Sequence, residues 1–176
     1  MIAAIVYHSK TGSCERYAKE LSRTLHLPAY ADGKAPTRAD GQIIYVSWAL
    51  AGKLVGLKKA MQRYDVAGAV LVGMSPVYPN SVENAKAANG LSPSFPLFVR
   101  QGAFHMSRLP APMRFVMKLK CREIAARLER KKPNLSPAEQ ALYTMVTTGE
   151  GEPPTWDVSD IARAFTPDGG GLHQAR

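Results

Sequence analysis

Short apolar runs alternate with segments of helical periodicity along the first hundred residues of the chain. Five runs are candidate strands, and they are residues 2–7, 28–31, 43–48, 67–74 and 95–99, with 28–31 the weakest. Three segments between them have apolar residues at helical spacing, and they are residues 15–25, 54–64 and 81–88. Strands that are apolar at almost every position are buried on both faces. The alternation therefore predicts an α/β fold in which helices cover both faces of a parallel sheet.

The region after residue 102 has a different pattern, because prolines interrupt residues 108–112 and helical spacing then resumes. The expected helices are residues 113–132, 138–147 and 158–165. Ser136 is the expected N-cap of the second of these helices, and Glu139 follows three residues later. A serine and a glutamate at this spacing predict a capping box.

Length and composition are those of an ordinary globular protein. The 176 residues are 45% hydrophobic and 21% charged, which predicts one domain over residues 1–166. Residues 106–150 would be a helical extension before the last helix, and the glycine-rich residues 167–176 a disordered tail. No apolar stretch approaches the roughly 20 residues of a membrane-spanning helix. We therefore expect a cytoplasmic protein.

The cysteines and histidines of the chain are widely dispersed. Cys14 and Cys121 are far apart and have no Cys-x-x-Cys spacing, and the four histidines form no cluster in the sequence. This distribution indicates neither a disulfide framework nor a metal site. No general base or nucleophile is evident, so we expect no catalytic residue.

The turn between the first strand and the first helix is rich in hydroxyl groups, and it reads Ser9-Lys10-Thr11-Gly12-Ser13-Cys14. A helix N-terminus offers unpaired N–H donors and a partial positive charge, which suit a dianion. The hydroxyl groups add donors, and Gly12 allows a ligand to approach the backbone closely. The turn therefore predicts a phosphate site, and the alternative is an ordinary exposed turn between a strand and a helix.

Residues 9–14 resemble the phosphate loop of flavodoxins, in which a Ser/Thr-x-Thr-Gly-x-Thr turn wraps the phosphate of FMN. The resemblance implies a three-layer flavodoxin-like fold, with a five-stranded parallel sheet in the order 2-1-3-4-5 and helices on both faces. The ligand then lies at the carboxyl ends of the strands, where the strand order reverses. Cys14 stands where the family has a second threonine, and a thiol is a weaker donor than a hydroxyl.

Three later segments are similar to a short-chain subfamily of flavodoxins. They are Trp48-Ala49-Leu50-Ala51-Gly52 after the third strand, Ser75-Pro76-Val77-Tyr78-Pro79 after the fourth, and Gln101-Gly102 after the fifth. The residues that match are Trp48, Gly52, Gly73, Tyr78, Pro79, Ser81, Gln101 and Gly102. Asn80 and Arg100 replace an aspartate and a cysteine of the subfamily.

The resemblance implies how these segments would hold a flavin. Trp48 and Tyr78 would enclose the two faces of the ring, since flat aromatic systems stack favourably. The backbone of residues 49–52, 75–79 and 101–104 would border the edge of the ring. From the residues alone two alternatives stay open: Trp48 caps the core at the end of a strand, and Tyr78 is a surface residue of a rigid loop.

The net charge of +9 is concentrated in one segment, because residues 100–132 hold ten Lys and Arg against two Asp and Glu. Within residues 113–132 an apolar stripe has three- and four-residue spacing, and it consists of Met113, Met117, Cys121, Ile124 and Leu128. One interpretation is a helix that covers the sheet and exposes a charged face. The others are a docking surface for an acidic redox partner or a contact with an anionic membrane. Phe115 and Val116 lie outside the stripe, and no motif for specific nucleic-acid recognition accompanies the charge.

Residues 114–119 also resemble a basic, methionine-rich stretch of the flavodoxin-like, quinone-coupled protoporphyrinogen oxidases of bacteria. Those enzymes carry a long insertion in the fifth strand that this chain lacks. The leading hypothesis is an FMN-binding electron-transfer protein. The second is an FMN-dependent oxidoreductase for a quinone or a protoporphyrinogen-type substrate, with residues 102–112, including His105, beside an open substrate site. The third is a flavin-free binding module. Cys14, which replaces the family's second threonine, leaves this hypothesis open.

Overall fold

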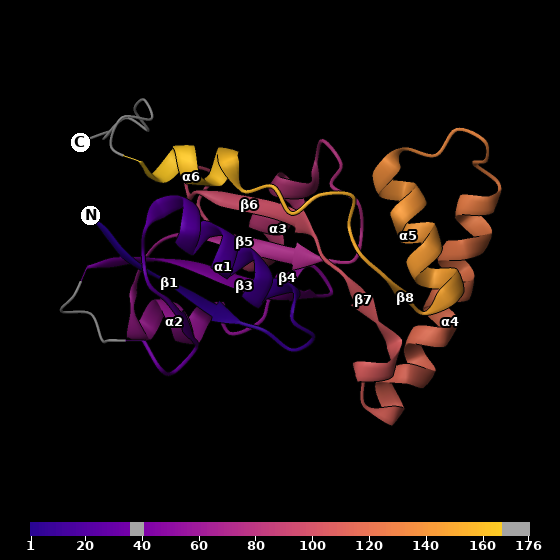
Figure 1. The fold of residues 1–176 in the computed structure, drawn as a ribbon, viewed down its shortest axis with the longest axis horizontal. Helices are drawn as coiled ribbons and strands as arrows, with labels where there is room; N and C mark the ends of the chain where they lie inside the picture. Colours follow the sequence, from indigo (N-terminus) through magenta and orange to yellow (C-terminus); the bar gives the residue numbers. More distant parts are fainter. Residues whose placement is uncertain (36–40, 167–176) are drawn as a thin grey trace.

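A parallel sheet forms the centre of the molecule (Figure 1), and the computed structural model describes residues 1–35 and 41–166 of the chain. Its strands are β1 (Ile2–His8), β2 (Ala29–Ala31), β3 (Gln42–Leu50), β5 (Asp65–Gly73) and β6 (Leu97–Gln101). They lie in the order β2-β1-β3-β5-β6, and every adjacent pair is parallel. The predicted order 2-1-3-4-5 is therefore confirmed. The prediction of a disordered tail at 167–176 lies outside the described residues.

Helices cover both faces of this sheet. They are α1 (Ser13–Leu25) and α6 (Ser159–Phe165) on one face, and α2 (Leu57–Arg63) and α3 (Ser81–Asn89) on the other. Successive strand residues point to opposite faces, so Ile44 packs with the α1 and α6 side and Tyr45 with the α2 and α3 side. Both side chains are fully buried. The fold is therefore a three-layer α/β fold of the flavodoxin-like class.

The end of β3 differs from the prediction. The strand continues to Leu50, and β4 (Lys53–Leu54) pairs with it in an antiparallel hairpin. Ala51 and Gly52 connect the two strands and have positive φ angles of 49° and 79°, as a two-residue type I′ turn requires. The predicted helix at 54–64 therefore begins only at residue 57. Leu54 is buried as a strand residue rather than as part of a helix.

A second unit follows the sheet, and it consists of a helical hairpin on a narrow neck. The hairpin is formed by α4 (Ala111–Glu129) and α5 (Pro137–Thr148), and the neck by the antiparallel strands β7 (Phe104–His105) and β8 (Glu150–Gly151). A short 3₁₀ turn at Met106–Arg108 lies between the neck and α4. Figure 1 shows the hairpin beyond the end of the sheet towards which the β5 and β6 arrows point. We call residues 104–151, which comprise the neck, this 3₁₀ turn, α4 and α5, the extension.

The start of α5 is as predicted. The Ser136 hydroxyl accepts a hydrogen bond from the Glu139 N–H, at 3.2 Å, and the Glu139 carboxylate accepts one from the Ser136 N–H, at 3.0 Å. These reciprocal bonds form the expected capping box. The helix ends at Gly149, whose φ angle of 81° is a left-handed conformation that glycine adopts without strain.

The interpretation of α4 as a helix that covers the sheet is wrong. Its apolar stripe packs against α5 instead, and the two helices share a small core with the neck. The buried members of this core are Phe104, Cys121, Leu128, Leu142, Met145 and Val146. Because α5 supplies an apolar partner, α4 needs no contact with the sheet to bury its stripe. Among the described residues no helix is both long and apolar enough to cross a membrane.

Candidate functional site

A cavity of about 180 Å³ lies where the carboxyl ends of β1, β3 and β5 face the extension. The sheet side contributes Lys10, Thr11, Ser13, Cys14, Trp48, Ala49, Leu50, Val72, Gly73 and Met74. The segment after β6 and the extension contribute Gly102, Ala103, Phe104, Leu109, Met113 and Met117. No carboxylate or imidazole is among these described lining residues. The walls are therefore apolar, with polar groups only at the turn that precedes α1.

The turn before α1 presents backbone donors. Gly12 is the N-cap residue and has a φ angle of 107°, which is a left-handed conformation open to glycine. The first hydrogen bond of the helix runs from the Arg16 N–H to the Gly12 carbonyl, at 3.0 Å. The N–H groups of Ser13, Cys14 and Glu15 precede it and have no carbonyl partner within the helix. The Ser9 hydroxyl accepts a hydrogen bond from the Gly12 N–H, at 3.2 Å, so Ser9 shapes the turn from within.

The Ser13 and Cys14 side chains have structural contacts of their own. The Ser13 hydroxyl accepts a hydrogen bond from the Ala103 N–H, at 3.0 Å, and so joins the turn to the segment after β6. Cys14 is 2% exposed and belongs to the buried cluster under α1. Burial raises the pKa of its thiol to about 12, which keeps the thiol protonated and weakly reactive. Donors for an anion at this turn are therefore backbone N–H groups and the half-buried Thr11, rather than Ser13 or Cys14 side chains.

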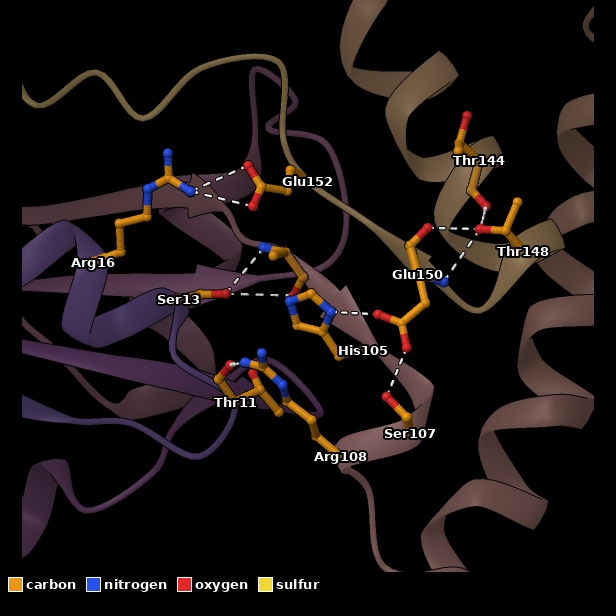
Figure 2. A network of polar contacts seen from close by, with 11 residues as sticks. Thr11, Ser13, Arg16, His105, Ser107, Arg108, Thr144, Thr148, Glu150 and Glu152 are labelled. Atoms are coloured by element: carbon orange, nitrogen blue, oxygen red, sulfur yellow. Dashed lines mark hydrogen bonds and ion pairs between the residues drawn. The ribbon is translucent and has the colours of Figure 1, made fainter.

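Arg108 contacts this turn from a distant part of the chain, and the sequence did not reveal the contact. It comes from the 3₁₀ turn of the extension, and its Nη1 donates a hydrogen bond to the Thr11 carbonyl, at 2.6 Å (Figure 2). A Cβ atom on Gly12 would lie 3.4 Å from the same Nη1. The guanidinium therefore lies directly over the turn and adds a positive charge. The only sequence signal was the excess of cations in residues 100–132.

Trp48 lies at the boundary between the core and the cavity. Its ring packs against the buried cluster on the α1 face and also lines the cavity. Its Nε1–H is buried without a hydrogen-bond partner, and a buried donor of this kind is stabilised when a ligand supplies an acceptor. The Lys10 Nζ lies 5.4 Å from the centroid of the ring, which is a cation–π contact. Trp48 thus both caps the core and faces the cavity.

The structure does not bring Tyr78 to this cavity. Tyr78 and Val77 are 42% and 47% exposed, and neither they nor Pro79 are among the described residues that line it. The Tyr78 N–H instead donates to the Ser81 hydroxyl, at 2.8 Å, at the start of α3. Met113 and Met117 of α4 line the cavity together with Trp48. Side chains of the extension, rather than the predicted tyrosine, therefore form the second apolar wall.

A second hollow, of about 420 Å³, adjoins the first at the ends of β3 and β5. Ala49, Gly73 and Met74 line both spaces. The predicted residues that line only the second hollow are Ala51, Gly52, Ser75 and Pro76. The predicted loops therefore meet at one edge of the sheet, but they border two adjacent spaces rather than a single pocket.

Gln101 and Gly102 hold the edge of the sheet together. Gln101 is 5% exposed, and its Nε2 donates to the Met74 and Ala138 carbonyls, at 3.1 Å each. It therefore links the loop after β5 to α5. A Cβ atom on Gly102 would lie 2.7 Å from the Val72 side chain, so only glycine allows this close approach. Both residues were predicted to contact a flavin. Gly102 lines the cavity, and Gln101 positions the elements around it.

The neck carries a polar network, and separate polar contacts nearby reach α1 and the turn at residues 9–14 (Figure 2). The Glu150 carboxylate accepts hydrogen bonds from the Ser107 hydroxyl, at 2.7 Å, and from His105 Nδ1, at 2.5 Å. These hydrogen bonds lower the pKa of Glu150 below its usual value. The bond from Ser107 has the larger effect and the bond from His105 the second. Arg16 of α1 donates to both Glu152 carboxylate oxygens, at 3.1 and 3.2 Å. The ion pair thus joins α1 to the segment that follows β8.

Comparison with models of protein families finds no match, and comparison with curated proteins finds none of significance. A solved structure of a flavodoxin from the domain Archaea is similar to this chain with a TM-score of 0.36 and 13% sequence identity. The similarity covers 58% of this chain and 85% of the other. The assignment of the fold therefore rests on the strand order and the three layers rather than on sequence relationship.

The side chains that line the cavity are mainly apolar. Within the described part of the chain no group of three or more His, Cys, Asp or Glu side chains is placed to hold a metal ion. The single thiol of the cavity, Cys14, has a raised pKa. The site combines the backbone N–H groups of a helix N-terminus with an apolar surface beside them. This combination suits a flat ligand that carries a phosphate.

Proposed function

We propose that the chain binds FMN at the carboxyl edge of its sheet and transfers electrons through it. The observation that carries the proposal is the junction of two features at that edge. A helix N-terminus with the Arg108 guanidinium over it adjoins an apolar cavity lined by Trp48, whose indole N–H is buried without a partner. The flavin would supply the redox chemistry, and the protein would bind and orient it.

The donor set fits the phosphate of FMN. The N–H groups at the start of α1, the Thr11 hydroxyl and the Arg108 guanidinium together suit a dianion. The Lys10 side chain is exposed, so it is free to leave the face of Trp48 and approach the phosphate. The Cys14 side chain is buried in the core, so the replacement of the family's threonine removes no donor that is exposed at the turn.

The test compares FMN with riboflavin, which has the same ring but no phosphate. Each is titrated into the purified protein, and binding is followed by flavin fluorescence. We expect FMN to bind at least about tenfold more tightly, because charge-assisted hydrogen bonds contribute roughly 1.5–3 kcal/mol each. Equal affinities would contradict the phosphate site. Failure to take up FMN would favour a flavin-free binding module.

The position of the ring is tested through the two tryptophans. A ring beside Trp48 quenches its fluorescence, so the quenching by FMN should be largely lost in Trp48→Phe and retained in Trp156→Phe. Trp156 is a suitable control because it packs under α1, next to Tyr17, and does not line the cavity. Quenching that is lost in the control variant instead would contradict this placement.

A second candidate function is an FMN-dependent oxidoreductase with its own small substrate, of the quinone or protoporphyrinogen type. The observation that favours it is the apolar wall that Leu109, Met113 and Met117 add over the site. Such a wall suits an apolar substrate more than a protein partner. Steady turnover of a quinone or porphyrinogen by the FMN-loaded protein without any partner would favour the enzyme. Flavin reduction that requires a partner protein would favour the electron carrier.

A further inference from the structure

We propose that the N-terminal half of α4 docks the protein on an anionic lipid surface. Phe115, Val116 and Leu119 are 68%, 57% and 55% exposed. They lie within five residues of one another on a single helix. Large apolar side chains at such exposure, grouped in one place, mark an interaction surface rather than scattered surface residues. We call these three residues the apolar trio.

The apolar trio faces away from the rest of the extension. Met117 and Cys121 are on the side of α4 that packs on α5. Phe115 and Leu119 are four residues apart, so they lie one above the other on a different side of the helix. Figure 1 shows α4 at the end of the molecule away from α6.

Cations surround the apolar trio. Those in the same stretch of the helix are Arg114, Lys118, Lys120 and Arg122, and all four are exposed. The first acidic residue of the helix is Glu123, and it pairs with Lys120 at 3.1 Å. Over residues 111–122 the helix therefore combines an exposed apolar centre with positive charge and no carboxylate.

This chemistry is that of a helix at a membrane surface. Apolar side chains enter the boundary between headgroups and acyl chains, and Lys and Arg lie at the level of the anionic headgroups. A fluid bilayer accommodates a small group of apolar side chains, whereas a stable protein interface needs about 800 Å² of matched surface on each partner. A second copy of the chain would place the same cations opposite one another, which is unfavourable.

The test measures co-sedimentation of the purified full-length chain with large vesicles. Vesicles of equal parts phosphatidylglycerol and phosphatidylcholine are compared with vesicles of phosphatidylcholine alone, at low and at high salt. We expect binding to the anionic vesicles at low salt and at least about tenfold weaker partitioning without anionic lipid or at high salt, because the attraction is screened. Absence of binding to anionic vesicles at low salt would overturn the proposal.

Two pairs of variants separate the contribution of α4 from that of overall charge. Arg114→Glu with Lys118→Glu should abolish binding, whereas Lys58→Glu with Lys59→Glu on α2 makes the same change in net charge and should retain most of it. Phe115→Ser with Leu119→Ser should weaken partitioning by at least about tenfold, because burial of one such side chain has a comparable effect. These positions are exposed, so folding should be preserved. Equal loss in both charge pairs would show that attraction is nonspecific and would overturn the proposal.

A fluorescent label reports which side chain meets the lipid. The native thiols Cys14 and Cys121 are buried, so a polarity-sensitive dye reacts selectively with an introduced cysteine. Phe115→Cys should give a blue shift on anionic vesicles, and the exposed position Gln62→Cys on α2 should give none. A shift only on addition of an acidic protein, or a dimer that is lost with Phe115→Ser, would assign the surface to another occupant.

Discussion

The sheet and the extension bury their apolar residues in different ways. The sheet has a buried cluster on each face, and its central strands contribute to both, as Ile44 and Tyr45 do. The extension has one small core between two helices and is joined to the sheet by strands of two residues each. The candidate site lies between these units. The wall formed by the sheet therefore depends on a large core, and the wall formed by the extension depends on where the small core holds α4.

The contacts between the two units lie close to the turn at residues 9–14. Arg108 binds the Thr11 carbonyl, Ser13 binds the Ala103 backbone, and Arg16 pairs with Glu152. An anion at the turn would compete with the Thr11 carbonyl for the Arg108 guanidinium. The difference between the units thus teaches that polar contacts hold the second wall of the cavity in place, whereas the first wall belongs to the core of the sheet.

The largest expected effect is on the core of the sheet. Ile44→Ala removes a fully buried side chain next to α1 and should lower the free energy of unfolding by about 3 kcal/mol. Urea unfolding followed by circular dichroism and by tryptophan fluorescence measures the loss. Val116→Ala, at an exposed position, is the control and should change stability by less than about 0.5 kcal/mol. A loss below about 1 kcal/mol for Ile44→Ala would contradict this account of the core.

The corresponding change in the extension should act locally. Leu142 is 1% exposed in the core between α4 and α5, and Leu142→Ala should destabilise that core by about 2 kcal/mol. Both tryptophans, Trp48 and Trp156, pack against the core of the sheet. The variant should therefore lose helical circular dichroism at lower urea than it loses its tryptophan signal. Two coincident transitions, shifted equally, would show that the units unfold together.

Substitution of Arg108 tests whether the contact between the two units contributes to FMN binding. Arg108→Gln removes the guanidinium over the turn and should weaken FMN binding by about tenfold, with little effect on riboflavin. Arg63→Gln is the matched control, because Arg63 also donates to a backbone carbonyl, that of Gly33, at 3.3 Å, but lies away from the cavity. Isothermal titration measures both affinities. An equal loss for FMN and riboflavin would indicate a structural role for Arg108.

The smallest expected effect is the response of the neck to acid. Hydrogen bonds from Ser107 and His105 hold the pKa of Glu150 below its usual value of 4.5. A carboxylate with a lowered pKa contributes stability above its unfolded pKa and loses it as pH falls through its folded pKa. Lowering the pH below about 4.5 should therefore reduce the melting temperature of the wild type more than that of Glu150→Gln. Parallel pH profiles for the two proteins would contradict this contribution.

Local patterns in the sequence were sufficient for the sheet and for several helix boundaries. Continuous apolar runs predicted the strands, and the spacing of Ser136 and Glu139 predicted the start of α5. The hairpin after β3 was missed because Lys53 and Leu54 pair with residues whose own sequence reads as a loop. The neck strands were missed because two-residue strands that pair across 45 positions leave no periodic signal.

The candidate site was only partly predictable for a related reason. The hydroxyl-rich turn and Trp48 were found because each follows directly from a strand with a clear pattern. Tyr78 is exposed and does not line the cavity. The sequence also did not show that α4 would line it, because a sequence does not say which apolar surface a helix packs against. The stripe on α4 fits a sheet or another helix equally well, and the choice of α5 brought Met113 and Met117 to the cavity.

The sequence by itself determined the alternation of strands and helices and the position of the hydroxyl-rich turn at residues 9–14, because both depend on neighbouring residues. Only the tertiary structure decided that Arg108 lies over Thr11, that Cys14 is turned into the core, and that the extension closes the cavity. These outcomes depend on contacts between residues that are distant along the chain. Such contacts follow from how whole elements pack, and packing is set by shape and buried area rather than by local pattern.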